Sequence, residues 1–254
     1  MVFAQAIAFT TLADDGTSSL SLVGLSSKLV EQIPMPGPGT IDELKGESDA
    51  GLLGFVFTSA GPAVAREFTS VLMRVDLSGD HAVAPVPDLA GKPLTVLSWG
   101  FLGGTTSIVA HGVDQTVLLI DASKSAPPVP LGQYTELGRS SPDGKSIVVS
   151  DVFGKIALSL ADGTKTRIPS LPIAGASTYG GDVVLLGKDV ARVQQVAVFD
   201  AATGGKFQSY LVYESGTTAR VLYQTKDDAG SIEGFSISPN GQFVAVNVIP
   251  DYAH

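Results

Sequence analysis

The sequence contains no cysteine and only three histidines among its 254 residues. The absence of cysteine excludes disulfides, thiolate zinc sites and cysteine nucleophiles. The histidines, His81, His111 and His254, show no HxH or HExxH spacing, so no histidine metal site is expected. Neither a GxSxG nucleophile elbow nor a GxxxxGK[ST] phosphate loop occurs. We therefore predict no catalytic residue and no metal-ligand cluster of these types.

Cations and long apolar runs are also scarce. The net charge is -9, the pI is near 4.7, and the 16 Lys and Arg form no run. Nucleic acid is not an expected partner, because phosphate binding needs clustered cations. No apolar run reaches the roughly 18 to 20 residues of a membrane span. The opening residues "MVFAQAIAFTTLADDG" lack a basic n-region and a cleavage site, so we interpret them as a strand, not a signal.

Short β-branched runs bounded by Gly, Pro, Asp and Ser occur throughout the chain, whereas helical spacing is not sustained anywhere. Examples are "GLLGFVFTS", "TSIVAHGV", "TVLLIDAS", "KSIVVSDV" and "QFVAVNVI", and they recur about every ten residues. This pattern predicts an all-β protein: an antiparallel sandwich, a barrel or a propeller.

Repeats favour the propeller among these three. A pattern of an apolar strand, a polar turn and a second strand recurs along the chain. The equivalent positions in its copies are Asp76, Asp121, Leu160 and Asp200, and successive positions are 45, 39 and 40 residues apart. A fifth copy places Gly24 at that point. A period of about 40 to 45 residues with four short strands is typical of a propeller blade.

A second phrase appears as "GRSSPDGKSIVVSD" and again as "FSISPNGQFVAVN". We predict that each is a tight hairpin, in which Pro142 presets φ, Asp143 or Asn240 caps its own backbone, and Gly144 or Gly241 supplies a positive φ.

These two phrases resemble the repeat of TolB-type propellers, which are related to WD-type repeats. The resemblance covers residues 136–170 and 231–249 well and the other repeats only by period; residues 97–112 lack the proline. It implies a scaffold for protein interaction or, in some members, a cover over a peptidase active site. It also implies an extracytoplasmic location, periplasmic or secreted, and the composition suggests a bacterial source.

We expect one propeller domain over residues 1–254, with approximate blades at 1–40 together with 231–254, 41–89, 90–132, 133–170 and 171–230. Both chain ends would then share one blade and remove exposed sheet edges. The ring has five blades, or six if "FQSYLVYESGTTARVLYQTK" is an additional hairpin. The alternative is a fragment of a larger propeller.

Two acids occupy equivalent positions, since Glu136 lies six residues before Pro142 and Glu233 six before Pro239. At the mouth of a propeller channel they could bind a cation, with calcium as the candidate, or fix a basic side chain of a partner. Asp227 and Asp228 would enlarge the same negative rim. The alternative interpretation is that these are ordinary solvated loop acids.

Aromatic residues give a second group of candidates: Trp99, the only tryptophan, with Tyr134 and Tyr179 at comparable stages of the next repeats. They could anchor a peptide or sugar at the channel mouth, although packing between blades is their ordinary role. Arg139, beside the turn, is a candidate ligand clamp or a structural hydrogen-bond donor.

Three functions stay open from the sequence. The leading hypothesis is a non-catalytic propeller that binds a protein or peptide partner at the channel mouth. The second is a propeller-type hydrolase or lyase acting on a sugar or other small molecule, which needs at least two convergent acids. The third is an accessory propeller of a larger enzyme.

Overall fold

The computed structural model describes residues 6–47, 51–59, 70–77, 80–124, 126–168, 183–186, 191–200, 206–215, 218–225, 231–238 and 242–249. The chain divides into two compact units, Met1–Gln133 and Tyr134–His254. Every regular element in the described residues is a β-strand, which confirms the all-β prediction.

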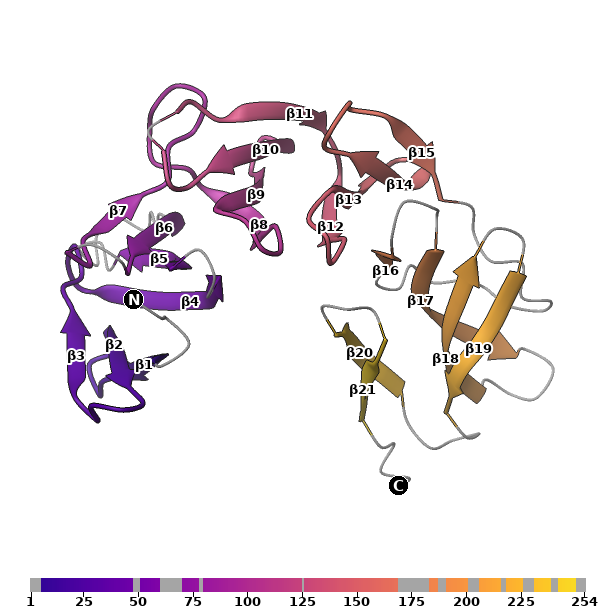
Figure 1. The fold of residues 1–254 in the computed structure, drawn as a ribbon, viewed down its shortest axis with the longest axis horizontal. Helices are drawn as coiled ribbons and strands as arrows, with labels where there is room; N and C mark the ends of the chain where they lie inside the picture. The colour runs from indigo at the N-terminus through magenta and orange to yellow at the C-terminus, as the bar shows by residue number, and fades with distance from the viewer. Residues whose placement is uncertain are drawn as a thin grey trace. The chain divides into compact units, whose positions relative to one another are not determined.

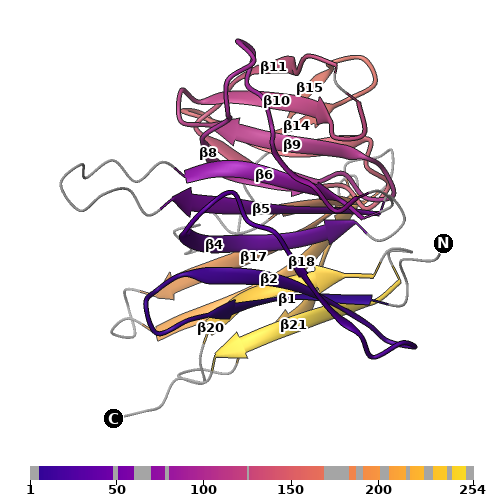
Figure 2. The ribbon, with the colours of Figure 1, turned by 90° about the vertical axis from the view of Figure 1, so that its left-hand side faces the viewer.

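The first unit holds three antiparallel sheets, each made of consecutive strands (Figure 1). In Figure 2 these strands cross the view as successive arrows. Their bounds are β1 (Ala6–Leu12), β2 (Ser18–Gly24) and β3 (Val30–Ile33) in one sheet, β4 (Gly39–Glu47), β5 (Leu52–Ser59), β6 (Ser70–Asp76) and β7 (Val83–Pro85) in the next, and β8 (Val96–Phe101), β9 (Ser107–Gly112), β10 (Thr116–Asp121) and β11 (Val129–Gln133) in the third.

The second unit also holds three antiparallel sheets of consecutive strands. Their bounds are β12 (Glu136–Ser140), β13 (Ser146–Asp151), β14 (Gly154–Ser159) and β15 (Lys165–Arg167), then β16 (Val183–Leu186), β17 (Ala191–Asp200), β18 (Lys206–Ser215) and β19 (Thr218–Gln224), and finally β20 (Ser231–Ile237) and β21 (Val244–Ile249). Strands β18 and β19, from the segment considered as an additional hairpin, complete the sheet that begins with β16. Whether the two chain ends share one blade stays a prediction.

One expected equivalence between repeats is wrong. Asp76 and Asp121 end the third strands of their sheets, β6 and β10, but Asp200 ends β17, which is the second strand of its sheet. The cause is that strand, polar turn and strand describe every hairpin of an antiparallel sheet. The periodic phrase therefore marks a hairpin without saying which one.

Middle strands are buried on both faces, which explains their continuous apolar runs. Along β5, Leu53, Phe55 and Phe57 pack in one core cluster with residues of β2 and β6, whereas Leu52 and Val56 pack in another with residues of β8 to β10. Successive side chains of a strand point to opposite faces, so one apolar strand serves both clusters. Strand β16, although it is the first strand of its sheet, also serves two clusters, because Val183 and Leu185 join one and Val184 the other.

The first strand of four sheets carries a β-bulge. The register shifts between Asp42 and Lys45 in β4, between Val96 and Ser98 in β8, between Leu137 and Ser140 in β12, and between Ile232 and Gly234 in β20. A bulge adds one unpaired residue and redirects the side chains beside it. Three candidate residues, Trp99, Arg139 and Glu233, lie at or beside these bulges.

The predicted Ser-Pro-Asp-Gly turn is confirmed in detail. Gly144 has a φ of +67°, and the Asp143 carboxylate accepts the Lys145 backbone N–H at 3.2 Å. The Ser141 hydroxyl oxygen accepts the Ser146 backbone N–H at 3.0 Å. Ser238 begins the Ser-Pro-Asn-Gly turn of the second phrase, and its hydroxyl oxygen accepts the Phe243 backbone N–H in the same way, at 2.9 Å. Pro239, Asn240 and Gly241 lie outside the described residues.

Aspartates cap many other turns by accepting the backbone N–H two residues ahead, as Asp143 does. The other members are Asp15, Asp80, Asp88, Asp114, Asp121, Asp151 and Asp162. Eight of the 25 acids of the chain therefore have a local structural role.

No helix in the part of the chain that the structure describes is long and apolar enough to cross a membrane.

Candidate functional site

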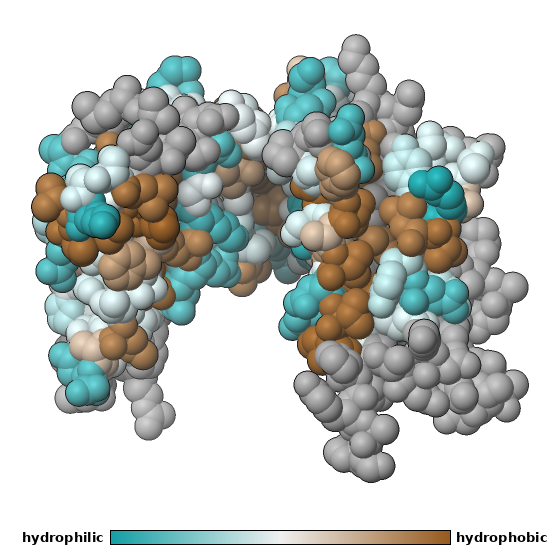
Figure 3. All heavy atoms as spheres, turned by 60° about the horizontal axis from the view of Figure 1, so that its bottom comes forward, coloured by the Kyte–Doolittle hydropathy of each residue, from teal (hydrophilic) through white to brown (hydrophobic). Residues whose placement is uncertain are grey.

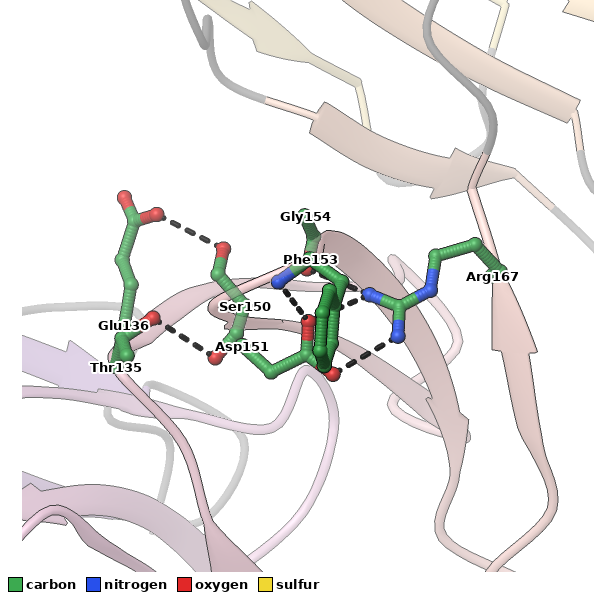
Figure 4. Close-up of polar contacts among 7 residues, drawn as sticks. All are labelled: Thr135, Glu136, Ser150, Asp151, Phe153, Gly154 and Arg167. Atoms are coloured by element: carbon green, nitrogen blue, oxygen red, sulfur yellow. Dashed lines mark hydrogen bonds and ion pairs between the residues drawn. The ribbon is translucent and has the colours of Figure 1, made fainter.

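Glu136 is the first residue of β12, and its side chain is exposed. Its Oε2 accepts a hydrogen bond from the Ser150 hydroxyl at 2.9 Å, across the pair that joins β12 to β13 (Figure 4). Among the described residues no partner occupies Oε1. Glu136 is therefore held in place through one oxygen and offers the other to solvent.

Glu233 shows the same arrangement on β20. It is the extra residue of the bulge, its side chain is exposed, and its Oε2 accepts from Asn247 Nδ2 at 2.6 Å. In both sheets the donor lies 14 residues after the glutamate, on the second strand. The predicted equivalence of the two acids thus includes the side chain that orients each of them.

The turn between β13 and β14 places two large apolar side chains at the same end of the sheet as Glu136. Val152 is 80% exposed and Phe153 is 82% exposed. Antiparallel pairing fixes this placement, because Glu136 pairs with Ser150 and Asp151 pairs with Gly154 across the turn. This end of the sheet thus combines Glu136 with two exposed apolar side chains, Val152 and Phe153, which together form the apolar tip.

Asp151 and Arg167 hold this turn in one geometry (Figure 4). Arg167 donates to Asp151 Oδ1 at 2.6 Å and to Oδ2 at 2.8 Å, and also to the Gly154 carbonyl oxygen at 3.1 Å. Asp151 Oδ1 in turn accepts the Phe153 backbone N–H at 2.8 Å. Hydrogen bonding by the Arg167 guanidinium lowers the pKa of Asp151 to about 2. The tip is thus preorganised, which reduces the entropy lost when a partner binds.

Arg139 lies in the bulge of β12 and contacts β20. Its guanidinium donates to the Phe235 carbonyl oxygen at 2.5 Å and lies 5.1 Å from the centroid of the Phe235 ring. This contact joins the two strands that carry Glu136 and Glu233. In the structure Arg139 thus makes the contacts of a structural hydrogen-bond donor.

Trp99 is buried on β8, with 4% of its surface exposed. Its ring lies edge-on to Phe101 at a centroid distance of 5.6 Å and packs against Gly54 of β5, where a Cβ would come within 2.6 Å of the ring. Lys45 covers the ring at 4.6 Å. Trp99 therefore fills the space between two sheets and has a packing role.

Tyr134 is also buried, and the Lys165 ammonium lies 5.2 Å from its ring centroid. Tyr179, Asp227 and Asp228 lie outside the described residues. Of the sequence candidates, the structure therefore places Glu136 and Arg139 on β12 and Glu233 on β20. Arg139 links these two strands through Phe235, and Tyr134 has a packing position.

Val152 and Phe153 were not candidates from the sequence, although a signal was present. The phrase "SDVFGK" places them between an aspartate and a glycine, at turn positions that Gly, Pro, Asn, Asp and Ser usually occupy. Large apolar residues there cannot reach the core.

Apolar and hydrophilic areas lie side by side on the molecular surface drawn in Figure 3.

Within the described ranges, no group of three or more His, Asp or Glu side chains is arranged to hold a metal ion.

Three solved structures share this arrangement of sheets. TolB from Acinetobacter baumannii superposes with a TM-score of 0.51 at 18% identity, covering 96% of this chain and 58% of TolB. The acylaminoacyl peptidase of Pyrococcus horikoshii gives 0.57 at 14% identity, with coverages of 91% and 38%. The β-propeller domain of the Trilobed protease from Pyrococcus furiosus gives 0.51 at 11% identity, with coverages of 92% and 69%.

The chain has a TolB-like β-propeller fold. Its sheets are therefore propeller blades, and β4, β8, β12, β16 and β20 are their first strands. The chain spans less than two thirds of the length of TolB. No family model matches the sequence, and no match is found among curated proteins. The resemblance at these identities concerns the fold alone.

Proposed function

We propose that this propeller is a non-catalytic scaffold that binds a protein or peptide partner through the blade ends of its second unit. The observation that carries the proposal is the matched pair Glu136 and Glu233, each exposed and each oriented through its Oε2, with no Oε1 partner among the described residues. Two oriented carboxylates favour a partner with Lys or Arg side chains, since charge-assisted hydrogen bonds are the stronger ones.

The apolar tip adds the second element of recognition. Large exposed apolar side chains, especially aromatic ones, supply much of the binding energy when they enter a partner. Val152 and Phe153 are held by Asp151 and Arg167 without contacting the core. We infer a partner segment that combines cationic and apolar side chains.

Peptide selection tests this proposal. A random linear peptide library is selected against the whole chain, and the affinities of enriched peptides are then measured by fluorescence anisotropy. We expect enrichment in Lys or Arg next to apolar residues. In Glu136→Gln/Glu233→Gln, affinity should fall at least about tenfold, which corresponds to about 1.4 kcal/mol.

The matched control is Asp14→Asn/Asp80→Asn, which removes two exposed acids from turns of the first unit. It should leave the affinities unchanged. Peptides without an excess of cations, or peptides that bind the glutamate double variant as tightly as the parent chain, would show that this site is not the binding surface.

The expected extracytoplasmic location belongs to the same proposal. Fractionation of the source cells, followed by detection of the chain, checks it, and recovery only with the cytoplasmic fraction would contradict it.

A further inference from the structure

A cavity of about 240 Å³ lies in the first unit, between the β4–β7 sheet and β10. Three cations line it: Arg74 of β6, Lys92 of the loop after β7, and Lys124 after β10. The only acid in its lining is Asp121. In a chain with 25 acids and 16 Lys and Arg, this local balance is the reverse of the overall one.

Asp121 does not neutralise the cavity, because its carboxylate is already saturated. Oδ2 pairs with the Lys124 ammonium at 2.7 Å. Oδ1 accepts the Thr106 hydroxyl at 2.9 Å, the Ser123 hydroxyl at 2.7 Å and the Ser123 N–H at 3.1 Å. Asp121 therefore compensates neither the positive charge of Arg74 nor that of Lys92.

Arg74 and Lys92 have no ion-pair partner among the residues that the structure describes. Arg74 lies on the same face of β6 as Leu72, which packs in the core cluster shared with Ile108 and Ile120 of the next sheet. Arg74 therefore faces the space between two sheets and is half-buried there. A half-buried unpaired guanidinium interacts more strongly with an anion than an exposed one does.

The wall that carries Lys92 is rigid. Val86 donates to the Leu72 carbonyl oxygen at 2.9 Å and accepts from the Leu94 N–H at 2.8 Å, which attaches the loop to β6. Asp88 Oδ1 caps the turn by accepting the Ala90 and Lys92 N–H groups, both at 2.8 Å. Preorganised walls lower the cost of binding.

We propose that this cavity binds a small organic anion through a carboxylate or phosphate group. Arg74 contacts the oxyanion with its planar fork, and Lys92 adds the second positive charge that Asp121 does not compensate. The volume lies below the range of drug-sized pockets, so the occupant is a small molecule. The lining residues belong to the first unit and the acids of the proposed partner surface belong to the second, so either proposal can fail without the other.

Isothermal titration calorimetry of the whole chain tests the proposal, with succinate and glycerol phosphate as the two anion probes and glycerol as the neutral one. We expect saturable binding of at least one anion with a Kd of about 1 mM or tighter, and none of glycerol. The anion that binds with the lower Kd shows whether the cavity prefers a carboxylate or a phosphate group. Absence of saturable binding by both anions overturns the proposal.

Variants separate the site from general salt effects. Arg74→Gln/Lys92→Gln should weaken binding at least about tenfold, whereas Lys145→Gln/Arg220→Gln, which removes two exposed cations of the second unit, should not. Arg74→Lys keeps the charge without the fork and should give an intermediate affinity. If Arg74→Gln fails to fold, Lys92→Gln/Lys124→Gln serves instead, and unchanged binding in either double variant overturns the assignment.

Discussion

Lys45 and Trp99 are joined twice, because the Lys45 ammonium donates to the Trp99 carbonyl oxygen at 2.6 Å and also lies over the Trp99 ring. Arg139 and Phe235 repeat this relationship in the second unit. Trp99 and Phe235 hold the same register, each two residues after the extra residue of a bulge and two before the last pair of the hairpin. In each unit, a cation at the bulge of one strand thus contacts the aromatic residue that follows the bulge of another strand, through a hydrogen bond and a cation–π contact.

Removing either cation should destabilise the chain. In Lys45→Met and Arg139→Met the aliphatic packing is kept, but a charged donor and a cation–π contact are lost. We expect the free energy of unfolding to fall by about 1 to 2 kcal/mol in each variant. Urea unfolding followed by circular dichroism measures this. Lys28→Met, at an exposed turn, is the control, and equal effects in all three variants would contradict a specific fastening role.

Gly54 should not tolerate a side chain. A Cβ there would lie 2.6 Å from the Trp99 ring, so Gly54→Ala should cost about 1 to 3 kcal/mol through overpacking. Gly100→Ala, next to Trp99 on β8, meets no atom within 4 Å and is the matched control, with an expected effect within about 0.5 kcal/mol.

The fluorescence of Trp99, the sole tryptophan, reports on this site directly. We expect emission from an apolar environment in the parent chain and in Gly100→Ala, and a red shift in Gly54→Ala. An unshifted spectrum with unchanged stability in Gly54→Ala would mean that the ring does not pack on this glycine.

The Asp151 and Arg167 pair should make stability depend on acidity. The pKa of folded Asp151 is about 2, below its ordinary value of 3.8, because Arg167 hydrogen-bonds the charged form. A lowered pKa stabilises the fold above the ordinary value, and this contribution disappears as the pH falls through about 2. The stability advantage of the parent chain over Asp151→Asn should therefore shrink between about pH 4 and pH 2.

Urea unfolding at a series of pH values measures this advantage. Asp14→Asn removes an exposed carboxylate that has no hydrogen-bond partner among the described residues, and it serves as the control. An advantage over Asp151→Asn that stays constant down to about pH 2 would argue against the ion pair.

Both copies of the hairpin phrase should lose stability when their serine is replaced, the buried copy more than the other. Ser141→Ala and Ser238→Ala each remove the hydroxyl that accepts a backbone N–H across the turn. We expect losses of about 1 to 2 kcal/mol for the buried Ser141 and about 0.5 to 1 kcal/mol for Ser238. Thermal unfolding measures both, with the exposed Ser236→Ala as control; a neutral Ser141→Ala would show that the turn does not need this bond.

The apolar tip should be dispensable for folding and necessary for binding. Val152→Ser/Phe153→Ser replaces two exposed side chains by residues common in turns, so stability should change by no more than about 0.5 kcal/mol. Affinity for the selected peptides should fall at least about tenfold. A strongly destabilised variant would instead assign Val152 and Phe153 a structural role.

Several features of the site could be predicted from residues near one another in the sequence. The phrases around Pro142 and Pro239 identified two equivalent hairpins and placed Glu136 and Glu233 at matching points, because turn chemistry is local. The period failed at Asp200, where β17 is the second strand of its sheet, because every hairpin shares the same pattern. The exposed Phe153 and the contact between Arg139 and Phe235 were not foreseen.

Alternation of apolar residues and turn chemistry act over a few residues, so they are enough to predict the all-β class, the repeat of antiparallel hairpins and the positions of tight turns. Which side chains are buried between sheets and which stay accessible depends on contacts between residues far apart in the chain. A bulge of one residue reverses the face on which a side chain lies, and the partner across two sheets can be 96 positions away, as for Arg139 and Phe235. Burial of Trp99 and exposure of Phe153 follow from that packing.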